Sequence, residues 1–472
     1  MILLQKITIE VVLIGAILAC GLYLPFNIGM DFRSGYGSWL FIGCGAYFLL
    51  SWILHKKYPC AQWVLHLLLF LAPLKMVLVS GFSDQHIVGG LLPWVDAGVY
   101  YRDALGLIEG DRLSDFSTRP LYPGLLASLL FLLNNNLIFV LAAFGIAHSL
   151  TALLFYRVVR LTACPVVAGV AVIVLFLFYR RFIGSVMPTQ IGLLLGEIAV
   201  ICLVFGIFKN KGVMIILGQF FLFLGLLIRP GALVILPLII IWGVYFADRF
   251  RFNKRTYLIS TGLTVVVAIG CHVSAGMLYG DPNTVPFSHY AMIFFGLVKG
   301  GQGYGVALDD LGNAGHYEIY QASWRYLIAN PLSLIFGVIE NYKQFVLPNS
   351  GALGFEFIGN VDSNIRPQLI RPCLMLLSAL GVLLAFRRIK HPFGGLVLVG
   401  MIGFYLSIAA IPPASADEMR AFAVTMPFLA IACGIGASFG LRLKNPISVV
   451  PETTAEEGSP WEGQIARNLG VF

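Results

Sequence analysis

The chain has 472 residues, of which 58% are hydrophobic and only 11% are charged, and its formal net charge is +8. Soluble domains carry about 25% charged residues, so a water-soluble fold of this composition would be covered by apolar surface. The composition excludes a soluble protein and predicts an all-α polytopic membrane protein. The basic residues lie in short clusters, which indicates membrane topology rather than nucleic-acid binding. The 8 cysteines form no CxxC pair or Cys/His cluster, so neither disulfides nor a zinc site is predicted.

The N-terminal stretch "MILLQKITIEVVLIGAILACGLYLPF" is long enough to cross a bilayer and lacks a small-residue cleavage site. It therefore predicts a retained first helix and not a signal peptide. Since a spanning helix needs about 20 apolar residues, the chain offers about 12 candidate spans, with a range of roughly 11 to 13. These candidates are residues 5–26, 37–54, 61–81, 137–158, 163–179, 187–207, 212–228, 230–247, 256–277, 368–386, 392–411 and 421–440.

The basic clusters test this topology, because positive residues concentrate in cytoplasmic loops. With the N-terminus in the cytoplasm, "DRFRFNKR" at 248–255 and "RRIK" at 387–390 fall inside. The same holds for Arg157 and Arg160 only if the short apolar segment 121–133 does not cross. This segment is therefore predicted to be an interfacial or re-entrant helix on the outer side, covered by protein.

Two large loops then share the extracytoplasmic face, residues 82–136 and residues 278–366. The first contains a helical pattern in which Asp96, Tyr100 and Asp103 fall on one stripe. The second contains two predicted amphipathic helices, which Asn330-Pro331 separates and which would lie on the membrane surface.

The chain is predicted to form a single transmembrane domain over residues 1–440. Residues 441–472 are polar, with acidic residues in the middle, which predicts a disordered cytoplasmic tail.

Several charged residues lie at predicted outer helix ends, against the inside bias of positive charge. Asp96 follows Pro93-Trp94, Arg119 precedes Pro120, and Arg229 and Arg420 lie at helix ends. Cations placed in this way suit a lipid phosphate or pyrophosphate. Each residue also has a structural alternative. Asp96 could stabilise the first turn of a helix, Arg119 could anchor the interface, and Arg229 could satisfy helix-end carbonyls.

The order of these features resembles the GT-C glycosyltransferases, specifically the bacterial relatives of protein O-mannosyltransferases and the lipid A aminoarabinose transferase. The resemblance covers roughly residues 60–440 and rests on motifs that are each weak alone. They are "DAGVYYRDALGLIEG" and "STRPLYPGLLASLL" in the first loop, "LLIRPGALVILPLIII" at 226–241, the segment 300–335, and "DEMRAFAVTMPFLAI" at 417–431. The chain departs from the family in three ways. Three helices precede the loop where the family usually has one, Ala97 stands where many relatives have an acidic residue, and Thr118-Arg119 replaces Glu-Lys.

The resemblance implies extracytoplasmic transfer of a sugar from a polyprenyl-phosphate donor, with inversion, to a glycolipid, a cell-envelope polysaccharide or a protein. Asp96 would be the catalytic base, and Arg119, Arg229 and Arg420 would contact the donor phosphate. One base suffices, because the phosphate leaves without an acid, unlike the two-carboxylate glycoside hydrolases. The expected supporting residues are Tyr100, Asp103, Tyr122, Glu418 and His289.

The resemblance further implies a bacterial cytoplasmic (inner) membrane location, with both termini in the cytoplasm. Use of a divalent cation, Mg²⁺ or Mn²⁺, is left open, with Asp96 as its ligand if one binds. Asp103 is not expected to share such a metal, since about 10 Å of helix rise separates it from Asp96.

Two other functions stay open. A transporter or lipid flippase predicts inverted repeats and charges near the middle of the membrane. Glu197 in "LLLGEIAV" is the main residue that fits this alternative. An O-antigen polymerase or ligase also transfers glycans, but it would place its catalytic residues in a late loop, and the early Asp96 disfavours it.

Overall fold

The structure is a computed structural model, and the protein is an all-α multi-pass membrane protein. The fold is described for residues 2–35, 37–114, 117–280, 289–303, 305–312, 314–346, 355, 365–411 and 418–440; within these ranges, side chains are not described for residues 2–4, 56, 289, 365–368, 418 and 440. The predicted tail 441–472 lies outside the described residues.

Nine helices in the described part are long and apolar enough to cross a membrane. Two of these spans continue through 3-10 helices, η1 (Arg180–Phe182) after α8 and η5 (Glu418–Thr425) before α19. The nine helices are α1 (Ile2–Leu22), α3 (Ser38–Lys57), α4 (Pro59–Ser80), α7 (Leu137–Thr162), α8 (Pro165–Tyr179), α9 (Pro188–Lys209), α12 (Lys254–Tyr279), α17 (Ile365–Arg387) and α19 (Met426–Gly440).

Three of the 12 predicted spans form shorter helices, namely α10 (Gly212–Ile228), α11 (Ile235–Phe246) and α18 (Pro392–Ile408). The first two are separated at Arg229-Pro230, because proline has no backbone N–H with which to continue a helix. At 17 residues, α10 is about 26 Å long, slightly less than the hydrocarbon core of a bilayer. Within the described ranges the long spans therefore number nine, or up to ten if the bent pair His316–Ala329 and Ser333–Val346 is one span, below the sequence-based count of 11 to 13.

The segment 121–133 forms α6 (Leu121–Leu132), a helix of 12 residues. Its length of about 18 Å is too short to cross a bilayer, in agreement with the sequence-based prediction. Asn134 and Asn135 end the helix with positive φ angles of 54° and 59°. Asn136 then caps α7, because its side-chain oxygen accepts hydrogen bonds from the backbone N–H groups of Ile138 and Phe139.

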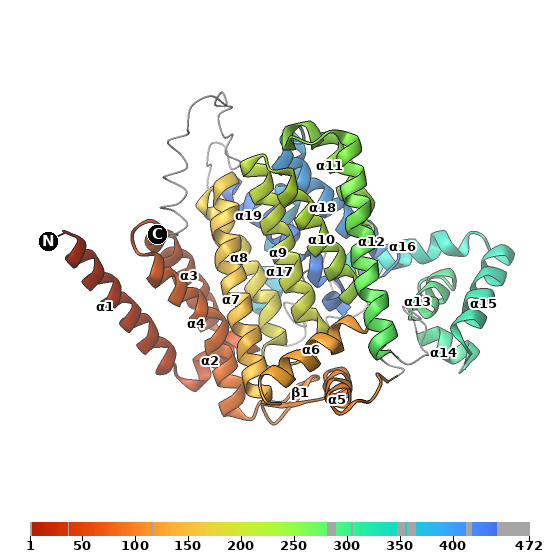
Figure 1. The fold of residues 1–472 in the computed structure, drawn as a ribbon, viewed down its shortest axis with the longest axis horizontal. Helices are drawn as coiled ribbons and strands as arrows, with labels where there is room; N and C mark the ends of the chain where they lie inside the picture. Colours follow the sequence, from red (N-terminus) through yellow and green to blue (C-terminus); the bar gives the residue numbers. More distant parts are fainter. Residues whose placement is uncertain are drawn as a thin grey trace.

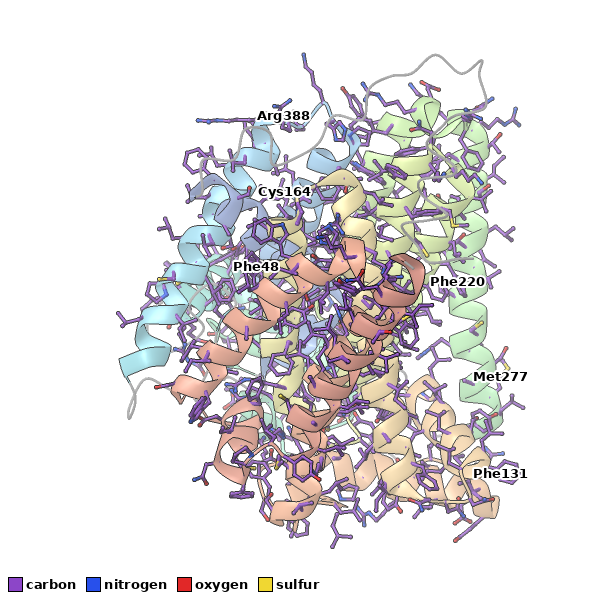
Figure 2. The ribbon with its side chains drawn as sticks, turned by 90° about the vertical axis from the view of Figure 1, so that its left-hand side faces the viewer. Phe48, Phe131, Cys164, Phe220, Met277 and Arg388 are labelled. Atoms are coloured by element: carbon purple, nitrogen blue, oxygen red, sulfur yellow. The ribbon has the colours of Figure 1, made fainter. Side chains whose placement is uncertain are left out.

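The two ends of the helix bundle carry different elements. Helices α5 (Asp96–Glu109) and α6 lie together at one end, beside a short hairpin of β1 (Ile87–Val88) and β2 (Leu92–Pro93) (Figure 1). Figure 2 shows Phe131 of α6 and Met277 of α12 at this end, and Arg388 at the opposite end, with Cys164 toward the Arg388 end. The basic cluster 387–390 and the α5–α6 loop therefore lie at opposite ends of the bundle, as the topology prediction requires.

The second large loop forms a separate helical unit beside α12 (Figure 1). It contains α13 (His289–Val298), α14 (Gly305–Leu311), α15 (His316–Ala329) and α16 (Ser333–Val346). The two predicted helices on either side of Asn330-Pro331 are confirmed as α15 and α16, which meet at a bend of 107°. Ala291, Phe295, Ala307 and Ile319 form a small core within the unit.

Two further elements were not predicted from the sequence. Helix α2 (Phe26–Arg33) packs against α4, and the one-turn helix η2 (Ala247–Phe250) follows α11. Both are too short to produce a clear hydrophobic period, so tertiary contacts decide their formation.

Candidate functional site

Asp96 begins α5, directly after the β1–β2 hairpin. The hairpin closes through a hydrogen bond from the Trp94 N–H to the His86 carbonyl at 3.0 Å. Val95 then adopts φ 48°, a conformation that β-branched residues rarely take. A residue keeps such a backbone conformation only where the surrounding structure restrains it. The turn at Val95 therefore restrains the backbone at the start of α5, where Asp96 lies.

Arg33 ties this hairpin to the bundle. Its Nη2 lies 2.8 Å from Asp84 Oδ2, and its Nε donates to the Ile183 carbonyl at 2.9 Å. Asp84 Oδ1 in turn accepts from the His86 N–H at 2.7 Å. Burial lowers the pKa of Arg33 to about 10, and Asp84 opposes this shift. The sequence analysis missed this support, since neither residue belongs to a motif.

The Asp96 carboxylate forms an ion pair with Arg420, with 2.8 Å between Oδ2 and Nη2. Asp96 is 25% exposed and Arg420 is 18% exposed, so solvent reaches both groups. Arg420 lies on η5, close to the end of the described chain. The structure therefore brings together the predicted base and one predicted phosphate contact from opposite ends of the sequence.

Glycines let η5 approach the bundle closely enough for this pairing. A Cβ on Gly196 of α9 would lie 2.2 Å from the Val424 carbonyl oxygen, and a Cβ on Gly231 would lie 2.1 Å from the Ala421 carbonyl oxygen. Real side chains do not tolerate such distances, so only glycine fits at these positions. The close contact of these glycines with the backbone of η5 therefore fixes the position of Arg420.

Arg229 lies beside the same segment. It caps the C-terminus of α10, where its N–H donates to the Gly225 carbonyl, and its Nε donates to the Arg420 carbonyl at 3.2 Å. The Tyr290 hydroxyl of α13 donates to the neighbouring Pro230 carbonyl. The described side-chain hydrogen bond of Arg229 is therefore made to the segment that carries Arg420, and the contact with the end of α10 is made by its backbone.

Arg119 lies near this group as well. Burial raises the pKa of Tyr290 to about 12, while the guanidinium groups of Arg119 and Arg229 act in the opposite direction. Arg119 Nε is buried and makes no hydrogen bond to a described residue. Arg119 also interacts electrostatically with His272 of α12. Three guanidinium groups and one carboxylate from four distant segments thus lie in one region, at the α5–α6 end of the bundle.

The expected supporting residues take structural positions. Tyr100 and Tyr122 meet edge to face with ring centroids 5.3 Å apart, and both are buried. Burial raises the pKa of Tyr122 well above its ordinary value. Asp103 accepts hydrogen bonds from the Ser114 hydroxyl at 2.9 Å and from the Ser114 N–H at 3.3 Å, so it holds the loop that follows α5.

The remaining expected residues can be placed only by backbone. His289 begins α13 and Glu418 begins η5, but their side chains lie outside the described part of the chain.

The described residues around Asp96 provide no set of ligands for a metal ion. In the described ranges, no group of three or more His, Cys, Asp or Glu side chains is arranged to hold a metal ion. The carboxylate of Asp96 faces the cation Arg420 and not a second acid.

Comparison of the chain with models of known protein families and with curated protein sequences finds no match. The structure defines the class as a multi-pass membrane protein.

Proposed function

We propose that this protein is an integral membrane glycosyltransferase of the GT-C type, which transfers a sugar from a polyprenyl-phosphate donor to an extracytoplasmic acceptor. The observation that carries the proposal is the Asp96–Arg420 ion pair at 2.8 Å, with Arg229 hydrogen-bonded to the same segment. The motif order that resembles the GT-C enzymes is independent support. The acceptor would be a glycolipid, a cell-envelope polysaccharide or a protein.

The charge balance favours an anionic ligand. Arg119, Arg229 and Arg420 contribute three positive charges, and Asp96 contributes one negative charge, which leaves two positive charges among these four groups. Guanidinium groups match phosphate oxygens in geometry and charge. Arg119, whose Nε makes no hydrogen bond to a described residue, can turn this donor toward a phosphate.

The proposed reaction is a single displacement. The acceptor hydroxyl attacks the anomeric carbon, its oxygen forms the new glycosidic bond, and the bond to the phosphate oxygen breaks with its electron pair on the phosphate. Asp96 takes the proton of the hydroxyl. The arginines stabilise the charge that develops on the leaving phosphate. A single displacement inverts the anomeric configuration.

The membrane orientation is part of the proposal. The α5–α6 end of the bundle would face the extracytoplasmic side of a bacterial inner membrane, and both termini would be cytoplasmic. The position of the basic cluster 387–390 at the opposite end supports this orientation.

The proposal is tested with purified protein in lipid, polyprenyl-phosphate sugars as donors and a panel of envelope acceptors. We expect Asp96→Asn to reduce transfer by about 10²-fold or more, as for loss of a general base. Glu109→Gln, which changes an exposed acid at the other end of α5, is the matched control and should keep wild-type activity. Full activity of a folded Asp96→Asn protein would exclude Asp96 as the base.

A further inference from the structure

A second group of ionisable residues lies inside the bundle, away from the candidate site. Glu197 is fully buried near the middle of α9, a helix of 22 residues. His148 of α7 is also buried, and its Nδ1 lies 3.9 Å from Glu197 Oε2. A buried acid at this depth is costly, and such residues in spanning helices are usually functional.

The pair has few hydrogen-bond partners. Thr151 Oγ1 contacts Glu197 Oε2, and it also lies 3.1 Å from each of the Ala147 and His148 carbonyl oxygens. A hydroxyl carries one proton, so it cannot donate to all three oxygens. Glu197 Oε1 and both ring nitrogens of His148 make no hydrogen bond with any described residue. An ionised Glu197, which is fully buried, would therefore have at most one hydrogen-bond donor among the described residues.

The surroundings supply little compensating charge. The His148 ring packs against Phe70 and against Tyr179, whose centroid is 4.0 Å away. Among the elements packed against α9, α10 carries no ionisable side chain. On the others, Tyr405 of α18 interacts with Cys433 of α19, and Arg420 of η5 pairs with Asp96. Tyr156, Arg157 and Arg160 lie in the last two turns of α7. On α4, which packs against α7, His66 contacts the Tyr47 hydroxyl and Lys75 donates to the Leu22 carbonyl.

We propose that His148 and Glu197 together bind one proton and form a proton-binding site inside the helix bundle. With one proton the pair has no net charge, either as neutral acid and neutral imidazole or as carboxylate and imidazolium. With none it would carry a buried negative charge, and with two a buried positive charge, and both are strongly disfavoured in a medium of low dielectric constant. When Thr151 donates to a backbone carbonyl, its oxygen accepts the proton of Glu197.

Tyr179 gives the pair a connection toward the α5–α6 end of the bundle. Its phenol interacts electrostatically with Glu197 and also with Arg33. Arg33 pairs with Asp84, which is 25% exposed. Tyr179 therefore lies in the electrostatic field of both the His148–Glu197 pair and the Arg33–Asp84 ion pair.

The site does not depend on the proposed glycosyl transfer, and unfolding measurements test it separately. In an unfolded chain, glutamate loses its proton at about pH 4.3 and histidine at about pH 6.5. Above pH 7 the folded pair holds one proton more than the unfolded chain, so stability falls as pH rises. Glu197→Gln, which carries no such proton, loses this dependence. We expect the ratio of the unfolding constants, wild type over Glu197→Gln, to rise about tenfold per pH unit from pH 7 to pH 9.

The measurement is detergent-induced unfolding followed by circular dichroism. Glu109→Gln, on the exposed surface of α5, is the matched control, and its ratio to wild type should not change with pH. Glu197→Met, neutral and of similar length, replaces Glu197→Gln if that variant does not fold. A ratio that stays constant for the Glu197 variant would overturn the proposal, whatever the outcome of the transferase assay.

Discussion

Asp96 and Arg420 form an ion pair of 2.8 Å between residues that lie at the start of α5 and on η5. Both side chains are partly exposed, so a ligand can reach either partner. The pair joins the loop between α4 and α7 to the last described span. The ion pair can form because Gly196 and Gly231 allow the backbone of η5 to pack closely against the bundle.

The pair should show energetic coupling. We expect Asp96→Asn and Arg420→Gln each to lower the free energy of unfolding by about 1 kcal/mol, because both charges are partly shielded from solvent. The double variant should lose less than the sum of the two, by about 0.5 to 1 kcal/mol. Chemical unfolding of the four proteins measures this difference, and strict additivity would show that the ion pair does not contribute to stability.

Gly196 should not tolerate a side chain. Because a Cβ would lie 2.2 Å from the Val424 carbonyl oxygen, we expect Gly196→Ala to destabilise the fold by about 1 to 3 kcal/mol and to displace Arg420. Gly262→Ala in α12 is the matched control. A Cβ there meets nothing within 4 Å, and alanine favours the helix by up to about 1 kcal/mol. Thermal unfolding compares the two, and equal transition temperatures would contradict the packing argument.

Arg33 should support Asp96 at a distance. Arg33 is buried but Asp84 is 25% exposed, so the Asp84 charge that remains is partly solvated, and we expect Arg33→Ala to cost about 1.5 to 3 kcal/mol for the lost charged hydrogen bonds. Lys343→Ala, which breaks the exposed Lys343–Glu340 pair, should leave stability unchanged. Unfolding by denaturant gives both values. Should the Arg33 variant keep wild-type stability, the Arg33–Asp84 contact does not hold the hairpin.

The raised pKa of Tyr290 predicts a dependence on alkaline pH. The folded protein keeps the phenol proton up to about pH 12, while an unfolded chain loses it near pH 10. The stability from this group is complete below pH 10 and declines as pH rises toward 12. Tyr290→Phe should remove this decline and cost about 1 kcal/mol for the lost bond to Pro230.

Phenolate absorbance, recorded during an alkaline titration, follows this group directly. Tyr317→Phe, which changes a tyrosine that is 73% exposed, is the control for general effects of removing one phenol. A titration in which Tyr290→Phe removes an absorbance change centred near pH 10 would contradict the burial of this phenol.

Arg119 should act on the donor. If it contacts the phosphate, Arg119→Ala should reduce kcat/KM for a polyprenyl-phosphate sugar by about 10²-fold. Arg119→Lys should recover only part of this loss, because lysine cannot donate two parallel hydrogen bonds. Arg102→Ala, an exposed arginine on α5, should keep wild-type activity. Equal activity of all three variants would remove Arg119 from the site.

The class of the protein and its local elements could be predicted from the sequence. Apolar runs of about 20 residues predicted the long spans, the stripe from Asp96 predicted α5, and Asn330-Pro331 predicted the break between α15 and α16. These features depend on neighbours along the chain. Helix length was less well predicted, since α11 and α18 are shorter than the apolar segments from which their spans were predicted.

Only the tertiary structure decided which charged residues meet. The motif order placed Asp96, Arg229 and Arg420 on one face, but it did not show that Asp96 pairs with Arg420 or that Arg33 holds the hairpin. Nor did it show that Glu197 faces His148. Such contacts join segments that are distant in the chain, and they depend on how closely helices approach. Glycines such as Gly196 allow the short distance between α9 and η5. The hydropathy of the sequence predicts which segments are helices, but it does not predict how closely two helices pack.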